Sequence, residues 1–439
     1  MMNWIKNSKI YIPIFLIILF FLSYLRSPDI FNNGRFWGED GVVYFQHAIK
    51  NSFFDNFFKI YTPTSGYYNL FPRIVALISS KFNLEYAPLV NNYLCYLIIL
   101  YIFFIILFNA SFLYKKTIEK FIYCILILVC PTLIPEVWLN SVNAQIYLSI
   151  CGILILYLKD NTKLIFKKIN LLVIFIGGFS SIYVFLLTPF FFIKYLIFKN
   201  KYNLLNFLIL LMSSCFQLFF YIYSKIYDKM IIRDVSGELN LSYIYTFFYN
   251  SFLKLFFPRE FIINLYSITT SNKTLIPFAL VLIITILIFS VFIFYKIIKK
   301  NYVKIPIIIS LMAILFSVLF VIIVFSGESL AGRYAALPGF LITLLIFHVA
   351  FYKYNNNFYK NYFVCLSLLI LFTGFHEYRP NDTYRIQYLD CINNCKSWKT
   401  QVETYKINTL KNELIIWPYN IEDDLSKFEY KNIIKMETK

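Results

Sequence analysis

Two adjacent carboxylates, Glu39 and Asp40, follow the first apolar stretch of the chain, in the segment FWGEDG at residues 36–41. Such a pair suits general-base catalysis, in which one carboxylate accepts the proton of an acceptor hydroxyl and the other orients that hydroxyl or stabilises developing charge. Trp37 could stack on a sugar ring, and Gly38 and Gly41 would let a substrate approach the backbone closely. The alternative is structural, because Asp at the start of a helix accepts backbone N–H bonds and complements the helix dipole.

A second set of polar residues lies at the turn between two later apolar stretches. Glu136 ends one of them, and Asn140, Asn143 and Gln145 lead into the next. A carboxylate near membrane depth favours a functional role, and an acid that simply reaches water is the alternative. Glu328, in the segment SGES at residues 326–329, is interpreted in the same way.

The arginines form a third pattern, because all of them fall on the predicted external side, whereas the cytoplasmic loops use lysine. They are Arg26, Arg35, Arg73, Arg233, Arg259, Arg333, Arg379 and Arg385. Arginine binds phosphate through two parallel hydrogen bonds, whereas lysine acts as a point charge. The pattern predicts an external site for phosphate or pyrophosphate, with Arg333 and its neighbour Tyr334 as the strongest candidates. Contact with lipid head groups, together with chance, is the alternative.

Composition places these residues in a membrane protein. Of 439 residues, 59% are hydrophobic and 15% are charged, whereas soluble domains carry about 25% charged residues. The apolar stretches lack the alternation typical of a barrel, so the fold class is predicted to be all-α and polytopic. Much of the net charge of +18 is lysine at the ends of the spans, which argues against nucleic acid as a partner and for a membrane-lipid setting.

The apolar stretches predict about eleven transmembrane helices. They cover residues 10–25, 88–108, 121–139, 143–158, 169–178, 180–198, 203–224, 275–295, 305–326, 334–352 and 361–374. The stretch 169–198 is interpreted as two short helices broken at Gly177-Gly178, because two crossings place every lysine cluster on the cytoplasmic side. The N-terminus is then cytoplasmic and the C-terminal tail external.

Two domains follow from this topology. Residues 1–374 form the transmembrane domain, with external loops at 26–87 and 225–274, and residues 375–439 form a small external α/β cap with a candidate strand at Glu413–Trp417. Cys391 and Cys395 in the tail could form a disulfide. No cofactor is predicted; a divalent metal is possible, with Glu39, Asp40, Glu136 and Glu328 as ligands, although their spacing does not require one.

With these features the chain resembles the GT-C superfamily of membrane glycosyltransferases. The resemblance is carried by residues 37–41, by the segment YNLFPR at residues 68–73, by the polar turn 138–145, by Gly332-Arg333-Tyr334, and by a C-terminal cap containing Trp417-Pro418. It covers the whole architecture through short motifs. Members of the family transfer sugars from polyprenyl-phosphate donors at the outer face of a membrane, and relatives include protein O-mannosyltransferases and aminoarabinose transferases.

The resemblance implies roles for individual residues. An acid of the first external loop acts as the base, which carries to Asp40, with Glu39 as its neighbour or substitute; many relatives have these acids in the reverse order. A phosphate-binding arginine carries to Arg333, and less surely to Arg73. Trp37, Glu136, Asn140, Asn143, Gln145 and Glu328 are then expected to bind substrate, and the acceptor is a cell-envelope glycan, a lipid or a protein.

Two other functions remain open. A polysaccharide polymerase or ligase of the O-antigen type would also use external arginines, with its acceptor-activating groups in a large later loop. A flippase or transporter of lipid-linked sugars would place charged residues at mid-membrane, and the predicted spans hold almost none. The absence of a glycine-rich phosphate loop argues against an NTP-driven pump or an enzyme of cytosolic nucleotide sugars.

Overall fold

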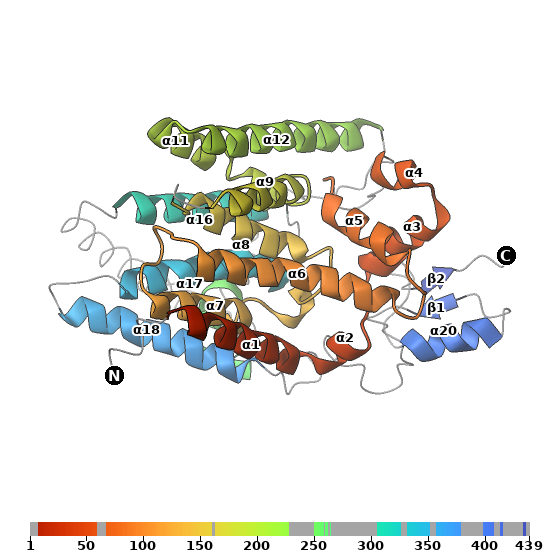
Figure 1. Ribbon diagram of the computed structural model, residues 1–439, viewed down its shortest axis with the longest axis horizontal. Helices are drawn as coiled ribbons and strands as arrows, with labels where there is room; N and C mark the ends of the chain where they lie inside the picture. Colours follow the sequence, from red (N-terminus) through yellow and green to blue (C-terminus); the bar gives the residue numbers. More distant parts are fainter. Residues whose placement is uncertain are drawn as a thin grey trace, which may run out of the picture. The chain divides into compact units, whose positions relative to one another are not determined.

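The protein is described by a computed structural model, and the described part of the chain is mostly helical (Figure 1). The described residues are 8–58, 67–159, 163–227, 250–258, 260–261, 264, 305–325, 332–351, 357–378, 398–407, 413–415 and 433–435. Glu328, Cys391, Cys395 and the expected span at 275–295 lie outside them. Several apolar helices are long enough to cross a membrane, which identifies a membrane protein.

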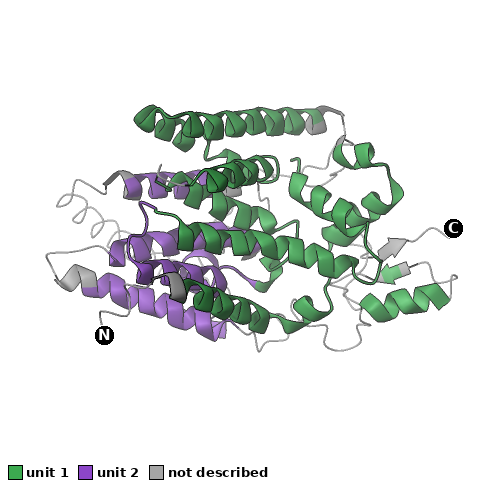
Figure 2. Cartoon of the chain, in the orientation of Figure 1, with its two compact units in different colours: residues 1–110, 135–232, 380–439 green, residues 111–134, 233–379 purple. Residues whose placement is uncertain are grey.

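The chain divides into two compact units, which Figure 2 colours separately. Unit 1 comprises residues 1–110, 135–232 and 380–439, and unit 2 comprises residues 111–134 and 233–379. The C-terminal tail therefore belongs to the same compact unit as the carboxylate segment. The division into domains at residue 374 stays a prediction.

Unit 1 holds the carboxylate pair and most of the described helices. They are α1 (Ser8–Arg26), α2 (Pro28–Asn32), the π-helix η2 (Asp40–Phe45), α3 (Gln46–Lys50), α4 (Phe53–Phe58), α5 (Leu70–Ser79), α6 (Ala87–Phe108), the 3-10 helix η3 (Pro135–Val137), α8 (Ala144–Leu156), α9 (Leu164–Gly178), α10 (Ile182–Phe185), α11 (Thr188–Phe198), α12 (Lys201–Tyr227) and α20 (Trp398–Ile407). Two strands, β1 (Glu413–Ile415) and β2 (Ile433–Lys435), pair antiparallel. β1 begins where the candidate strand was predicted, and the α/β cap as a whole stays a prediction.

Unit 2 contains α7 (Thr117–Val129), the 3-10 helices η4 (Leu253–Leu255) and η5 (Gly332–Ala335), α16 (Ile305–Phe325), α17 (Ala336–Ala350) and α18 (Asn357–His376). α17 packs against α16, α18 and η5. α7 ends well before residue 139, the predicted end of its span, because Pro131 and Pro135 follow and a helix usually ends before a proline.

Three described helices are long and apolar enough to cross a membrane by themselves, namely Ala87–Phe108, Lys201–Tyr223 and Arg333–Ala350. The stretch predicted to hold two short helices forms a pair, Leu164–Gly178 and Ile182–Phe198, bent by 117°. α9 ends at Gly178, where the sequence predicts a break. A Cβ at Gly178 would lie 2.5 Å from Ser213 Oγ, so glycine is required for this close approach of α12. The count of eleven spans stays a prediction.

The break after α9 is bonded to the segment that leads into α5. The N–H of Leu70 donates to the carbonyl of Phe179 (3.1 Å), and the N–H of Phe71 donates to Ser180 Oγ (2.8 Å). Gln217 of α12 accepts from the N–H of Tyr68 (3.0 Å) and donates to its carbonyl (2.8 Å). These bonds fix the start of α5, which carries Arg73.

α8 forms the centre of unit 1, with every residue from Ile146 to Leu156 buried. α6, α9 and α10 pack around it. Its uniformly apolar surface suits burial on all sides, since no face has to meet water. At its end, Lys194 of α11 donates to the carbonyls of Ile155 (3.2 Å) and Leu158 (2.9 Å), where a cation complements the helix dipole.

Candidate functional site

The carboxylate pair opens a π-helical turn. Glu39 precedes η2 and Asp40 is its first residue. π-helical turns are rare and occur frequently at functional sites. Gly38 leads into the turn with φ of +32°, a region that glycine enters without the penalty other residues meet. Backbone geometry therefore singles out the same segment as the sequence.

Asp40 is buried, and both of its carboxylate oxygens accept hydrogen bonds. Oδ1 accepts from Ser141 Oγ (2.7 Å) and from the N–H of Val142 (3.0 Å). Oδ2 accepts from the N–H of Ser141 (3.0 Å) and from Asn91 Nδ2 (3.4 Å). Asp40 thus holds the turn that leads into α8, and links it to α6. The donors to Asp40 come from the turn before α8 and from α6, and not from its own helix.

Burial raises the pKa of Asp40 to about 6. The hydrogen bonds from Ser141 and Val142 lower this pKa, and the nearby Glu39 carboxylate raises it by a smaller amount. A carboxyl group with this pKa changes charge close to neutral pH, which is the range that suits acid–base chemistry. The folded protein holds this proton more tightly than the unfolded chain does. The free energy of unfolding therefore falls as pH rises from the ordinary pKa of 3.8 to about 6.

Glu39 is partly exposed, in contrast to its neighbour. Trp37 is buried, and the guanidinium of Arg35 lies 5.0 Å from the centre of its ring. Arg35 also donates to the carbonyl of Trp138 (3.4 Å), and its N–H donates to Asn92 Oδ1 (2.7 Å). Sugar stacking on Trp37 stays a prediction, and its ring serves the packing of this segment.

The turn before α8 is held by its own asparagines. The side-chain amides of Asn140 and Asn143 donate to the carbonyl of Glu136, and the N–H of Asn143 donates to Asn140 Oδ1 (2.7 Å). Leu139 has φ of +52°, an uncommon conformation for a residue other than glycine. Its carbonyl accepts from Asn92 Nδ2 (2.6 Å). Both asparagines are buried, so their bonds shape the turn.

Two of the predicted site residues in this region, Glu136 and Gln145, are partly exposed. Gln145, in the first turn of α8, donates through Nε2 to the hydroxyl of Tyr67 (3.1 Å). This bond joins the turn before α8 to the segment before α5. The structure therefore brings the Glu136–Gln145 turn and the carboxylate pair together, as Asp40 bonds the middle of that turn.

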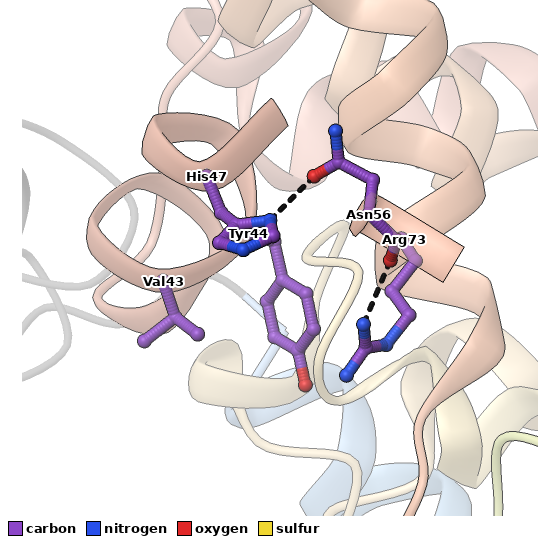
Figure 3. A pocket seen from close by; sticks show the side chains of 5 residues that line it. All are labelled: Val43, Tyr44, His47, Asn56 and Arg73. Carbon is purple, nitrogen blue, oxygen red and sulfur yellow. Dashed lines mark hydrogen bonds between the residues drawn. The ribbon is translucent and has the colours of Figure 1, made fainter. Parts of the chain in front are cut away.

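Arg73 of α5 lies in a pocket beside η2, as Figure 3 shows. The pocket is lined by Val43, Tyr44, His47, Asn56 and Arg73. Its cavity of about 10 Å³ has room for about one water molecule. Arg73 is buried and donates through Nη1 to the carbonyl of Asn56 (2.7 Å). His47 Nδ1 lies 2.6 Å from Asn56 Oδ1.

Tyr44 connects this pocket to the carboxylates. Burial raises the pKa of its hydroxyl, the neighbouring Tyr67 raises it further, Arg73 lowers it, and Glu39 and Asp40 raise it slightly. Groups of both charges therefore act on one hydroxyl. The sequence alone did not identify Tyr44, His47, Asn56 or Ser141. The available signal was spacing, since Tyr44 and His47 follow Asp40 at about one and two helical turns.

Arg333 and Tyr334 belong to unit 2, where they lie in η5 at the start of α17. The Arg333 guanidinium lies 5.3 Å from the centre of the Tyr334 ring. Both side chains are partly exposed. Their role with the donor phosphate stays a prediction, as does that of Glu328.

Within the described residues, no group of three or more His, Cys, Asp or Glu side chains is placed to hold a metal ion. The groups that the structure brings together are instead a carboxylate pair, a tyrosine and a buried arginine. No family model, curated protein or solved structure matches this chain.

Proposed function

We propose that the chain is a membrane glycosyltransferase of the GT-C kind. It moves a sugar from a polyprenyl-phosphate donor to a cell-envelope glycan, lipid or protein acceptor, as a step of cell-envelope polysaccharide biosynthesis. The observation that carries the proposal is that the turn begun by Glu39 and Asp40 also carries Tyr44, which lines one pocket with the buried Arg73, in a protein whose other helices are largely apolar. A base and an anion-binding cation are the two groups that displacement of a lipid phosphate by a hydroxyl requires.

Within this proposal, Glu39 is the group that accepts the proton of the acceptor hydroxyl. It is partly exposed, whereas both oxygens of its buried neighbour already accept hydrogen bonds. Asp40 then fixes the backbone on which Glu39 stands, through its hydrogen bonds to Ser141 and Val142. The family resemblance implies Asp40 as the base and Glu39 as its neighbour, so this assignment exchanges the roles of the two carboxylates.

Arg73 is the proposed contact for the donor phosphate. A buried guanidinium in a pocket with polar neighbours favours an anionic group, which it can bind through two parallel hydrogen bonds. The pocket opens beside the turn that carries the carboxylates. Arg333 is retained as a second phosphate-binding candidate in the other unit.

The packing of unit 1 supports the proposed topology of eleven spans with an external tail. The segment Phe36–Phe45 contacts α20 of the tail, which supports an arrangement with the first loop and the tail on one side of the membrane. An even number of crossings therefore separates them. The eleven-span arrangement has ten, with a cytoplasmic N-terminus and an external loop and tail, in a cell membrane.

The test is sugar transfer by the purified protein from a set of polyprenyl-phosphate sugars to cell-envelope acceptors. Glu39→Gln is expected to lower kcat by about 100-fold or more. Arg73→Lys keeps the charge and loses the planar fork, so it is expected to raise KM for the donor. Asp29→Asn is the matched control, because Asp29 is an exposed carboxylate on α2.

Transfer that survives in Glu39→Gln would move the base to another residue. Transfer from no donor would refute the glycosyltransferase proposal and favour the polymerase or the transporter. Those two are separated by substitutions in loop 225–274 and by lipid transport that persists without Glu39 and Asp40.

A further inference from the structure

The C-terminal helix α20 packs on the segment that carries the carboxylate pair. Phe36 and Phe45 lie at the two ends of that segment, and their ring centres are 4.3 Å apart. The ring of Trp398, the first residue of α20, meets Phe36 edge-on with centres 5.2 Å apart. All three side chains are buried, and Ala87, Val402 and Leu414 complete the cluster.

Two polar contacts attach α20 to the segment just before α6. Trp398 Nε1 donates to the carbonyl of Leu84 (2.7 Å), and Lys406 Nζ pairs with Glu85 Oε1 (2.5 Å). α6 also carries Asn91, which donates to Asp40. α20 therefore contacts both the carboxylate segment and the helix that bonds it.

The carboxylate segment depends on such packing for its shape. η2 spans six residues, and helices of this length are marginal without tertiary contacts. Its π-helical geometry is rare in itself. Because Phe36 and Phe45 close on each other across the turn, whatever holds these two rings also holds the backbone between them. An aromatic side chain buries about 150–250 Å² and dominates such a cluster.

We propose that Trp398 is a positioning residue for the carboxylate pair: its ring holds Phe36 and Phe45 together and so fixes the turn that presents Glu39 and Asp40. It acts through its contact with Phe36, whose ring packs on that of Phe45. The consequence for catalysis rests on the proposed function, whereas the consequence for the conformation of η2 does not.

Hydrogen exchange of the full-length protein in lipid nanodiscs tests the conformational part. In Trp398→Ala, amides of residues 36–45 are expected to exchange about tenfold faster or more, while those of α7 in the other unit keep their rates. Ile407→Ala is the matched control, since Ile407 lies on the same helix and is 87% exposed. Unchanged exchange at residues 36–45 in Trp398→Ala, or an equal change in the control, would overturn the proposal.

Trp398→Phe is a second variant, which tests the proposal if Trp398→Ala does not fold. It keeps an aromatic ring against Phe36 and loses only the bond to the Leu84 carbonyl, so it is expected to restore slow exchange at residues 36–45. General loosening of the whole chain in Trp398→Phe would overturn the proposal, because the ring alone should suffice.

Activity gives a second readout that a merely structural role would not move. Per folded molecule, Trp398→Ala is expected to lower kcat about tenfold or more while KM for the donor stays unchanged, and Trp398→Phe is expected to recover most of the rate. An equal change in KM would contradict positioning of the carboxylates. If the wild type transfers no sugar, the proposed function fails, and the exchange experiment still decides the role of Trp398.

Discussion

The buried carboxyl group of Asp40 predicts an unusual dependence of stability on pH. Its ordinary pKa is 3.8, and burial raises this value to about 6 in the folded protein. Between these two values the folded protein keeps a proton that the unfolded chain has released. Stability that Asp40 provides in its neutral form is therefore lost as pH rises from about 4 to about 6.

Asp40→Asn removes this titration, because asparagine carries no ionisable group at these pH values. The two pKa values differ by about two units, and each unit corresponds to about 1.4 kcal/mol. Between pH 4 and pH 7 the unfolding free energy of the variant is therefore expected to gain about 2 to 3 kcal/mol relative to the wild type. The hydrogen bonds lost with the charge shift this difference by a similar amount at every pH.

Thermal unfolding of the purified protein in detergent, at several pH values from 4 to 7, measures the effect. A change of about 3 kcal/mol corresponds to about 3 °C in the midpoint of a chain of this size. Asp29→Asn, which removes an exposed carboxylate, should track the wild type throughout. A constant difference between Asp40→Asn and the wild type would refute the inference that Asp40 is buried with a raised pKa.

Two further predictions concern the contacts that hold the site. Gly34→Ala is expected to destabilise the fold by about 3 kcal/mol or more, because its Cβ would lie 2.3 Å from the backbone nitrogen of Leu89. Gly38→Ala has no atom within 4 Å of its Cβ. It should therefore lose only about 1 kcal/mol of stability to backbone strain. Comparison of their unfolding midpoints checks the pair, and equal losses would contradict the close approach. Gln217→Leu should lower stability by about 2 kcal/mol, because it leaves the buried N–H and C=O of Tyr68 without their partner. Denaturant unfolding checks this, and an unchanged midpoint would mean that the break after α9 is held by other contacts.

The sequence predicted the helices well where one property determines them. The uninterrupted apolar stretches at 88–108 and 305–326 coincide with α6 and α16. Apolar length governs these elements, and it can be read along the chain. The π-helical form of the first turn had no signal in the sequence, because it depends on what the turn packs against.

The site was predictable in its residues more than in their roles. Asp40 was expected to be the base, with Glu39 as its neighbour or substitute. In the structure Asp40 is buried and accepts hydrogen bonds from Ser141 and Val142, which lie about a hundred residues further along the chain. Asn140 and Asn143 were expected to meet substrate, and in the structure their amides bond the carbonyl of Glu136. Such contacts depend on how distant segments pack, which residue type and local spacing do not determine.

The contact between Trp398 and Leu84 has a consequence for the synthesis of the protein. These residues are 314 positions apart, and at about 5–20 residues per second the ribosome needs about 15 to 60 s to pass from one to the other. During that time the carboxylate turn lacks the ring that packs on it. The packing of α20 on the carboxylate turn is therefore completed only after residue 398 has been made, and a chain truncated before that residue would lack the ring of Trp398 against Phe36.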